Sequence, residues 1–238
     1  MLCWRQERGN HETMNHPDQL ETAYITHHTI HARYGFSYRV AERGPRFAAW
    51  VGAGKRLLDL GCRDGNLTQY YASGNRVTGV DIDRQALALA SDRLGIATVW
   101  LDLNRESLPF DDGSFDVVVA GELLEHLLDP ISVVHEVYRV LAPGGMFIGS
   151  VPNSFHWRAR LAPLRGRSME DPTHVHRFSW SRIRQLLREF EDMQLVPVGG
   201  IGGRVLPVVP TWLSQPLVHA LPQMLANDFL FRARRACQ

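Results

Sequence analysis

The stretch Arg56-Leu-Leu-Asp-Leu-Gly-Cys-Arg-Asp-Gly65 decides how this chain folds. Its first half is a short apolar segment typical of a buried strand, and its second half contains two glycines. Because glycine has no Cβ, Gly61 and Gly65 allow the backbone to turn tightly and to pass close to a ligand. The segment 66–72 is expected to form a helix. A strand, a glycine-rich turn and a helix in this order predict a ligand site at the carboxyl end of the strand.

Apolar strands alternate with helical segments along the rest of the chain. Residues 20–52 look helical, and Asp83 and Asp129 are suited to cap two of the later helices. This alternation predicts an α/β fold with a parallel, doubly wound sheet, whose ligands bind at the carboxyl ends of the strands. Further strands are expected at 76–80, 97–101, 115–120, 146–151, 195–198 and 229–233, and helices at 83–95, at 129–141 and from 179 or 181 onward.

The composition is that of a folded intracellular protein. Apolar residues make up 45% and charged residues 21% of the 238 residues, which is sufficient for a normal core. The 26 basic and 25 acidic side chains give a net charge of +1, so nucleic-acid binding driven by overall charge is not expected. The three cysteines are scattered and form no C-x-x-C zinc spacing. Since no secretory signal is visible, we expect a reduced, cytoplasmic protein without a nucleic-acid partner.

The chain is expected to contain a polar tail and one domain. No linker is long enough to divide it. The tail would be flexible, and the domain would combine a ligand-binding core with a cap over the site. The expected parts are the tail 1–20 and the domain 21–238, with its core at 55–152 and its cap at 153–178 and 200–227.

The segment 205–227 carries no formal charge. Four prolines interrupt it, so we reject a membrane-spanning helix. We expect short helices that pack on the sheet. The alternative is a lid over an apolar acceptor, or contact with a membrane surface, for which Trp212 is suited.

Acidic residues follow two neighbouring strands. Asp81 ends the second strand, 22 positions after Asp59. A carboxylate at this place can accept hydrogen bonds from both ribose hydroxyls of a nucleotide. The glycine spacing is not G-x-G-x-x-G, so a pyrophosphate cradle is not predicted. An anionic side chain at the turn instead suits a ligand that carries an ammonium or sulfonium group.

These motifs resemble the class I S-adenosylmethionine-dependent methyltransferases. The large subgroup of small-molecule O-, N- and C-methyltransferases, which includes quinone-pathway enzymes, is the most similar one. The resemblance covers roughly residues 55–152 and implies a Rossmann-like, doubly wound sheet of seven mostly parallel strands, with helices on both faces and a late antiparallel strand. The matching elements are Leu57-Leu-Asp-Leu-Gly-Cys-Arg-Asp-Gly65, Val80-Asp-Ile-Asp83, Leu101-Asp102-Leu103, Leu108-Pro-Phe-Asp-Asp-Gly-Ser-Phe-Asp116, Glu122-Leu-Leu-Glu-His126 and Leu141-Ala-Pro-Gly-Gly145.

By position, the resemblance implies that residues at successive strand ends contact S-adenosylmethionine. Arg63 departs from the family, which usually has a third glycine there, and its side chain would have to point to solvent. For Asp81 alone, a local turn or helix cap is the simpler interpretation. The implied contacts are Asp59, Gly61 and Gly65 to the methionine part, Asp81 to the ribose, Ile82, Asp102 and Leu103 to the adenine, and Gly121 and Glu122 near the sulfonium.

Methyl transfer to a hydroxyl needs a general base, and histidine is the usual one. His174 and His176 lie in a polar segment expected over the acceptor, although each could equally serve as a simple hydrogen-bond donor. His126 lies in a run that is mainly structural in the family. His-x-His could also bind a metal, but the sequence shows no third ligand, so we predict no metal site.

The resulting hypothesis is a methyltransferase that uses S-adenosylmethionine to methylate an O or N atom of a small molecule, such as a sugar, a natural product or a quinone-like compound. The cluster Arg158, Arg160, Arg165 and Arg167 suits an anionic acceptor or is a solvated surface. The main alternative is an accessory protein that binds the same cofactor without methyl transfer, since such relatives share Pro152-Asn153 and Trp157-Arg158. A nicotinamide-dependent oxidoreductase is disfavoured by the missing G-x-G-x-x-G. No pattern predicts an oligomeric state.

Overall fold

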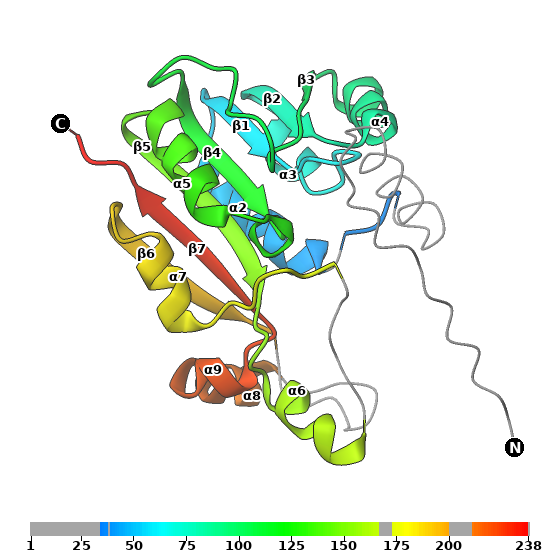
Figure 1. Ribbon diagram of the computed structural model, residues 1–238, viewed down its shortest axis with the longest axis vertical. Helices are drawn as coiled ribbons and strands as arrows, with labels where there is room; N and C mark the ends of the chain where they lie inside the picture. The colour runs from blue at the N-terminus through cyan, green and yellow to red at the C-terminus, as the bar shows by residue number, and fades with distance from the viewer. Residues whose placement is uncertain (1–33, 38, 167–172, 200–210, 238) are drawn as a thin grey trace, which may run out of the picture.

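A computed structural model describes residues 34–37, 39–166, 173–199 and 211–237 (Figure 1). The expected tail 1–20 and the first part of the expected 20–52 helix lie outside these residues. The described part of that helix is α2 (Val40–Val51). The remaining helical elements are α3 (Gln69–Ala72), α4 (Arg84–Leu94), η1 (Leu124–His126), α5 (Pro130–Val140), α6 (Trp157–Leu161), η2 (Pro163–Arg165), α7 (Trp180–Leu186), α8 (Thr211–Ala220) and α9 (Pro222–Leu225).

Seven strands form one sheet in the order β3-β2-β1-β4-β5-β7-β6 (Figure 1). All neighbours from β3 to β5 are parallel, and β7 is antiparallel to both β5 and β6. This confirms the predicted sheet, including its late antiparallel strand. The strands are β1 (Arg56–Leu60), β2 (Arg76–Asp81), β3 (Ala97–Trp100), β4 (Phe115–Gly121), β5 (Leu141–Pro152), β6 (Glu191–Val198) and β7 (Asp228–Arg234).

Both faces of the sheet are covered, as the apolar strands require. Along β4, Val117 and Val119 face the cluster that contains α2, α3 and α4, whereas Val118 and Ala120 face the cluster that contains α5 and α7. Successive side chains of a strand point to opposite faces, so a strand that is apolar at every position must lie in the middle of the protein. In Figure 1, α5 and α7 lie in front of the sheet and α2 lies behind it.

The capping predictions are confirmed. The Asp83 side chain accepts a hydrogen bond from Ala86 N at 3.0 Å and begins α4, and Gly95 ends it with a φ of 65°. The Asp129 side chain accepts from two amides of the first turn of α5, and Pro130 occupies its first position. The helix expected over 66–72 is shorter than predicted, because the chain remains in turns through Thr68, whose hydroxyl donates to Asp59.

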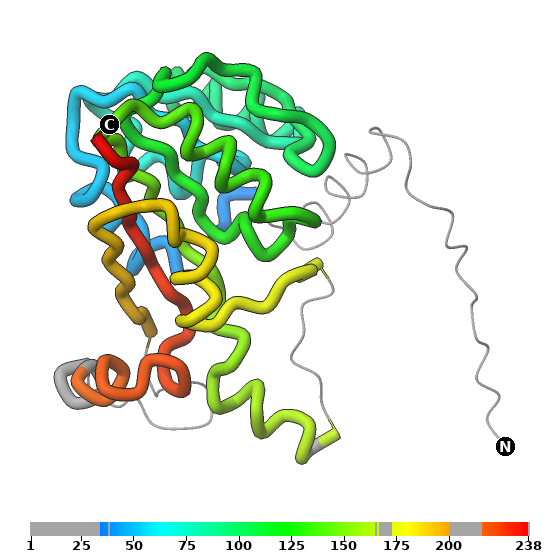
Figure 2. Tube along the Cα trace, turned by 60° about the vertical axis from the view of Figure 1, so that its left-hand side comes forward, coloured from blue at the N-terminus to red at the C-terminus, as the bar shows by residue number. Residues whose placement is uncertain are grey.

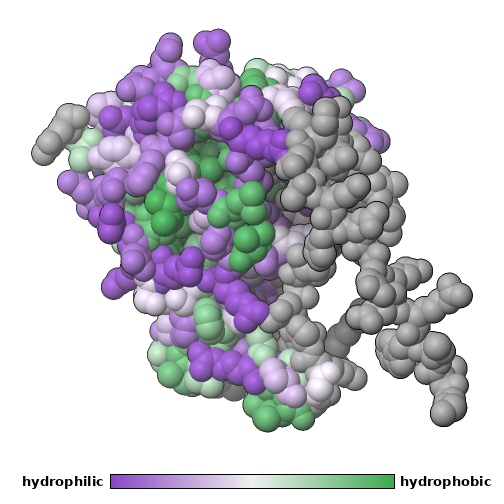
Figure 3. Space-filling view, viewed as in Figure 1, coloured by the Kyte–Doolittle hydropathy of each residue, from purple (hydrophilic) through white to green (hydrophobic). Residues whose placement is uncertain are grey.

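Helices α6, α8 and α9 lie together beyond one end of the sheet (Figures 1 and 2). Val218 of α8 and Ala226 after α9 are fully buried, so the described part of the 205–227 segment packs on the core as preferred from the sequence. Trp212 belongs to α8, but its side chain is outside the description. Apolar residues are also exposed on this part of the surface (Figure 3), among them Leu164, Leu217, Leu221 and Met224. No described helix is long and apolar enough to cross a membrane.

Candidate functional site

The turn after β1 brings the predicted glycines together. Gly61 has a φ of 69° and Gly65 a φ of 74°, values that glycine adopts without strain. A Cβ on Gly65 would lie 2.6 Å from Leu94 Cδ1, so any side chain there would have to displace Leu94 of α4. Gly61 N donates to Val80 O at 2.8 Å, which fixes the turn beside the end of β2.

Arg63 also has a positive φ, 47°, and this explains why a glycine would suit the position. Its side chain leaves the turn rather than filling it. The guanidinium donates to Phe36 O at 2.6 Å and lies 3.8 Å from Asp64. The departure from the family pattern therefore ties the segment 34–37 to the turn.

Asp59 ends up buried beneath the turn, with 3% of its surface exposed. Thr68 Oγ1 and Tyr71 Oη donate to its Oδ2 at 2.7 and 2.9 Å. Burial raises the pKa of Asp59 to about 7, although these two hydrogen bonds lower it. The side chain therefore also anchors the turn to α3.

Asp81 lies at the end of β2 and accepts two backbone hydrogen bonds. Arg63 N donates to one carboxylate oxygen and Asp83 N to the other, both at 2.9 Å. The second bond is the local turn that the simpler interpretation expected. The first bond spans 18 residues and fixes the carboxylate beside the glycine turn. A nucleotide ribose can bind to the remaining lone pairs.

The end of β3 adds the third acid and an aromatic surface. Asp102 is buried and ion-paired with Arg105 Nε at 3.2 Å. Trp100 Nε1 donates to Ile82 O at 2.7 Å, and the Arg84 guanidinium stacks 4.1 Å from the Trp100 ring. Leu103 packs against the core beside them. We call the carboxyl ends of β1, β2 and β3 with these residues the β1–β3 edge.

The other half of the same side of the sheet is the β4–β7 edge: the ends of β4 and β5 and the start of β7. Gly121 ends β4, where a Cβ would lie 2.6 Å from a Leu67 methyl group. Glu122 follows with a φ of 56°, an uncommon backbone conformation for a non-glycine residue. The Arg43 guanidinium, only 2% exposed, lies 3.7 Å from Glu122 Oε1 and donates to Ser150 Oγ at 3.1 Å.

Two more carboxyl groups are buried at the β4–β7 edge. Glu125 is 1% and Asp228 is 2% exposed. Burial, followed by the charge of Glu122, raises the pKa of Glu125 well above its usual range and that of Asp228 to about 8. Neither carboxylate oxygen of Glu125 accepts a hydrogen bond from a described residue. Arg39 Nε lies 3.4 Å from Asp228. This edge therefore brings several ionisable groups together away from water.

The three candidate histidines have different positions. His126 and His174 pack edge to face with 4.8 Å between ring centroids, next to Glu125. His176 points elsewhere: its Nε2 lies 3.1 Å from Leu128 O, and its Nδ1 lies 3.4 Å from Arg182 Nη2. This geometry favours His174 rather than His176 as a residue of the site.

Sequence reasoning missed three residues that build the β4–β7 edge, namely Arg43, Glu125 and Asp228. Glu125 was inside a quoted motif, but nothing in the motif distinguishes a buried carboxylate from a solvated one. Arg43 lies four residues before the buried Phe47, on the same face of α2. An arginine on an apolar helix face is a usable signal. Asp228 is the first residue of β7 and had no recognisable pattern.

Comparison with known proteins gives matches that include the residues of the β1–β3 edge. Residues 58–149 match the model of a family described as a methyltransferase domain. The ubiquinone biosynthesis O-methyltransferase of Ralstonia nicotianae is 42% identical over 98 residues, 39% of this chain and 41% of that protein. A probable S-adenosylmethionine-dependent methyltransferase of Mycolicibacterium smegmatis is 34% identical over 145 residues, 59% of this chain and 54% of that protein. The chain spans about half the length of the curated relatives it matches.

The solved structure of a SAM-dependent methyltransferase from Archaeoglobus fulgidus is similar with a TM-score of 0.63. The two are 17% identical, and the similarity covers 82% of this chain and 92% of that one. At this identity the likeness shows the fold alone.

Proposed function

We propose that the chain is a class I S-adenosylmethionine-dependent methyltransferase, because residues 58–149 match the model of a methyltransferase domain. It would transfer the methyl group of this cofactor to an oxygen or nitrogen of a small molecule. The proposal rests on one observation: the β1–β3 edge and the β4–β7 edge lie next to each other on the same side of the sheet. The β1–β3 edge presents a turn and acidic side chains for a nucleoside. The adjoining β4–β7 edge presents buried charged groups for a second ligand.

The described residues fit S-adenosylmethionine. Asp81 lies at the end of β2 and suits the ribose hydroxyls, while Ile82 and Leu103 offer apolar surface for the adenine. Asp102 would accept from the adenine amino group. The turn at Gly61 leads toward Gly121 and Glu122, where the sulfonium would lie. Glu122 provides negative charge near this cationic end of the cofactor, and the buried Asp59 anchors the turn beside it.

The cofactor supplies a methyl group, which forms a bond to the acceptor atom as the carbon–sulfur bond breaks and its electron pair passes to sulfur. The chain has to hold the acceptor in line and to remove the acceptor's proton. We assign the first task to the β4–β7 edge, whose buried groups exclude water. We assign the second to the neighbourhood of His126 and His174. His176 holds the backbone beside them and stays a weaker candidate.

Relatives favour a hydroxyl acceptor. Several similar proteins are named as O-methyltransferases of ubiquinone biosynthesis. We therefore propose a small molecule with a hydroxyl group, apolar or anionic elsewhere. Arg158 and Arg160 lie on the neighbouring α6, where Arg160 donates to Phe155 O at 2.8 Å. The described cysteines, Cys62 and Cys237, form no disulfide, and we propose the cytoplasm as the compartment.

The Pro152-Asn153 motif, one of the two motifs that suggested an accessory protein, has a structural explanation. Asn153 Nδ2 donates to Ala226 O at 2.7 Å and to Gln223 O at 3.1 Å. Its Oδ1 accepts from Phe155 N at 3.0 Å. These bonds join the end of β5 to the segment after α9. The Pro-Asn motif therefore has a structural reason that any function would share.

Two measurements test the proposal. Calorimetry should show binding of S-adenosylmethionine and of its demethylated product to the purified chain. Incubation with labelled S-adenosylmethionine and an extract of small molecules from the source cell should then give labelled products in mass spectrometry. Binding without any labelled product would favour the accessory alternative, and no binding would contradict both.

A further inference from the structure

Five charged side chains gather at the β4–β7 edge from elements that are distant in sequence. Arg39 and Arg43 come from the start of α2, Glu122 follows β4, Glu125 lies in η1 and Asp228 begins β7. The Arg43 guanidinium lies 3.7 Å from Glu122 Oε1, and Arg39 Nε lies 3.4 Å from Asp228 Oδ2. Each of the five side chains is at least four-fifths buried. We call these five residues the charge cluster.

The charges of this cluster do not balance. It contains two guanidiniums and three carboxyl groups, so the fully ionised cluster has a net charge of −1. Glu125 accepts no hydrogen bond from a described residue at either oxygen. A buried carboxyl group whose charge is not compensated binds a proton instead. Burial, followed by the charge of Glu122, accordingly raises the pKa of Glu125 well above its usual range and that of Asp228 to about 8.

The groups around α2 and α6 do not supply the missing positive charge. Glu42 pairs with Arg39 at 3.1 Å, but it is itself acidic, and its side chain is 48% exposed and screened by water. Burial, followed by the charges of Arg158 and Arg39, lowers the pKa of His156 to about 4, so this ring is neutral at pH 7. Because the carboxyl groups of the charge cluster interact, the proton they bind belongs to the cluster as a whole.

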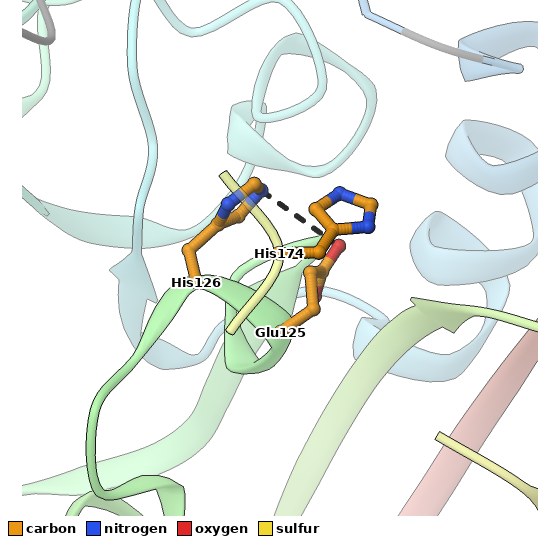
Figure 4. Close-up of side chains that lie close together, drawn as sticks. All are labelled: Glu125, His126 and His174. Carbon is orange, nitrogen blue, oxygen red and sulfur yellow. Dashed lines mark ion pairs between the residues drawn. The ribbon is translucent and has the colours of Figure 1, made fainter. Parts of the chain in front are cut away.

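Two histidines connect the charge cluster to the space proposed for the acceptor. Figure 4 shows the rings of His126 and His174 beside the Glu125 carboxylate. His126 Nε2 lies 3.9 Å from Glu125 Oε1, and the two rings pack with 4.8 Å between their centroids. A proton on either ring is therefore part of the same exchange as a proton on the carboxyl groups.

The methyl-carrying end of the cofactor has the charge that the cluster lacks. This step rests on the proposed function, which places the sulfonium beside Gly121 and Glu122. S-adenosylmethionine has a positively charged sulfur, whereas its demethylated product, S-adenosylhomocysteine, has a neutral thioether. The two ligands share their amino and carboxyl groups. A sulfonium beside the charge cluster therefore favours the ionised carboxylates, and the thioether does not.

We propose that the charge cluster exchanges a proton for the sulfonium. It holds one proton in the free protein, releases this proton to water when S-adenosylmethionine binds, and takes one up again during methyl transfer. In that step the acceptor oxygen forms a bond to the methyl carbon, and the carbon–sulfur electron pair passes to sulfur. The hydroxyl proton of the acceptor then moves to the charge cluster. The positive charge lost at sulfur is thus replaced, and the site stays balanced before and after the reaction.

The exchange predicts different pH dependences for the two ligands. Binding of S-adenosylmethionine releases a proton, so its affinity rises with pH by up to about tenfold per pH unit while the free charge cluster is protonated. Binding of S-adenosylhomocysteine leaves the proton in place, so its affinity does not follow this rise. Glu125→Gln leaves two guanidiniums opposite two carboxylates and removes the reason to hold a proton. Asp228→Asn does the same from another element.

Calorimetry in two buffers of different ionisation enthalpy counts the protons released per ligand bound. We expect the wild type to release about one more proton with S-adenosylmethionine than with S-adenosylhomocysteine, and the ratio of their affinities to rise about tenfold between pH 6 and pH 7. Both effects should be lost in Glu125→Gln and in Asp228→Asn. Glu42→Gln is the matched control, because it removes an exposed carboxylate beside the same arginine, and it should keep both effects.

The outcomes separate the exchange from the proposed function. Equal proton numbers for the two ligands in the wild type, or the same difference in the wild type and both cluster variants, would overturn the exchange. If labelled methylated product still forms in that case, the proposed function stands without it. If the additional proton is released but no product forms, methyl transfer fails and the exchange stands as a property of cofactor binding. No binding of either ligand would contradict both.

Discussion

The two edges on one side of the sheet differ in how their charged groups are satisfied. At the β1–β3 edge, Asp59 and Asp81 accept hydrogen bonds from hydroxyls and backbone amides, and Asp102 pairs with Arg105. At the β4–β7 edge, Glu125 is buried without a hydrogen bond from any described residue. Both edges are acidic, but among the described residues Asp59, Asp81 and Asp102 each have a polar partner, whereas the Glu125 carboxylate accepts no hydrogen bond.

This difference indicates what each edge is built to do. A satisfied carboxylate keeps a fixed direction and can recognise a constant ligand, such as a nucleoside, through its remaining lone pairs. An unsatisfied buried group costs folding stability and is expected where a ligand completes it. The comparison therefore assigns the constant cofactor to the first edge and the chemistry on the acceptor to the second. Four predictions test this assignment, from the largest expected effect to the smallest.

His174→Ala should lower the rate of methyl transfer by about 10²–10⁴-fold, the usual contribution of a group that helps to remove a proton. Its affinity for S-adenosylmethionine should stay the same, because the ring belongs to the β4–β7 edge. The rate is measured with labelled cofactor and the acceptor found in the extract. His176→Ala is the control and should keep most of the rate. A large loss in the control and none in His174→Ala would reverse the assignment.

Arg43→Met should reduce the free energy of unfolding by about 3–5 kcal/mol, since it leaves buried partners of a charged group without compensation. Arg43 contacts Ser37, Ser150 and Glu122. The measurement is urea denaturation followed by circular dichroism. Arg46→Met on the exposed side of the same helix is the control and should change little. Equal stability of both variants would show that the β4–β7 edge does not depend on this guanidinium.

Asp59→Asn should change the pH dependence of stability. The pKa of Asp59 is about 7 in the folded protein and about 3.9 in an unfolded chain. The folded state holds the proton more tightly, so the contribution of Asp59 to stability is full below pH 4 and is lost as the pH rises to 7. Asparagine keeps an accepting oxygen but does not titrate. As the pH rises between these values, the free energy of unfolding of the variant should therefore increase relative to that of the wild type by on the order of 3 kcal/mol.

Urea denaturation at pH 4.5 and pH 7.5 measures this difference. Asp92→Asn, an exposed change on α4, is the control and should follow the wild type at both pH values. If the difference in free energy of unfolding between Asp59→Asn and the wild type were the same at both pH values, Asp59 would be ionised throughout this range. Its hydrogen bonds to Thr68 and Tyr71 would then satisfy a charge rather than a neutral acid.

Asp81→Ala should weaken binding of S-adenosylmethionine by ~1–3 kcal/mol, the scale of lost hydrogen bonds to a charged group. Calorimetry gives this value, with Asp92→Ala, an exposed change on α4, as the control. An unchanged cofactor affinity would remove Asp81 from the site and leave it as a turn residue only.

Much of the fold could be predicted, because its signals are local. The strand-turn pattern 56–65, the caps Asp83 and Asp129 and the apolar runs of β4 and β5 each act within a few residues. Boundaries were less accurate. β5 begins at Leu141 rather than at 146, because Leu141 already pairs with Phe115 before an irregularity in the ladder. Such pairings depend on a neighbouring strand, which periodicity in one segment does not contain.

The sequence by itself determined the β1–β3 edge. Its glycines, its acids and their order follow from short motifs, because each side chain extends from the end of a strand whose position the sheet dictates. Only the tertiary structure decided the β4–β7 edge. Glu125 is buried under a segment that lies about 48 residues further along the chain. Val175 N and His176 N donate hydrogen bonds to the Glu125 carbonyl, and in this arrangement His174 rather than His176 lies next to the Glu125 side chain. An irregular segment has no periodicity from which to predict the direction of its side chains, so its long-range hydrogen bonds set that direction.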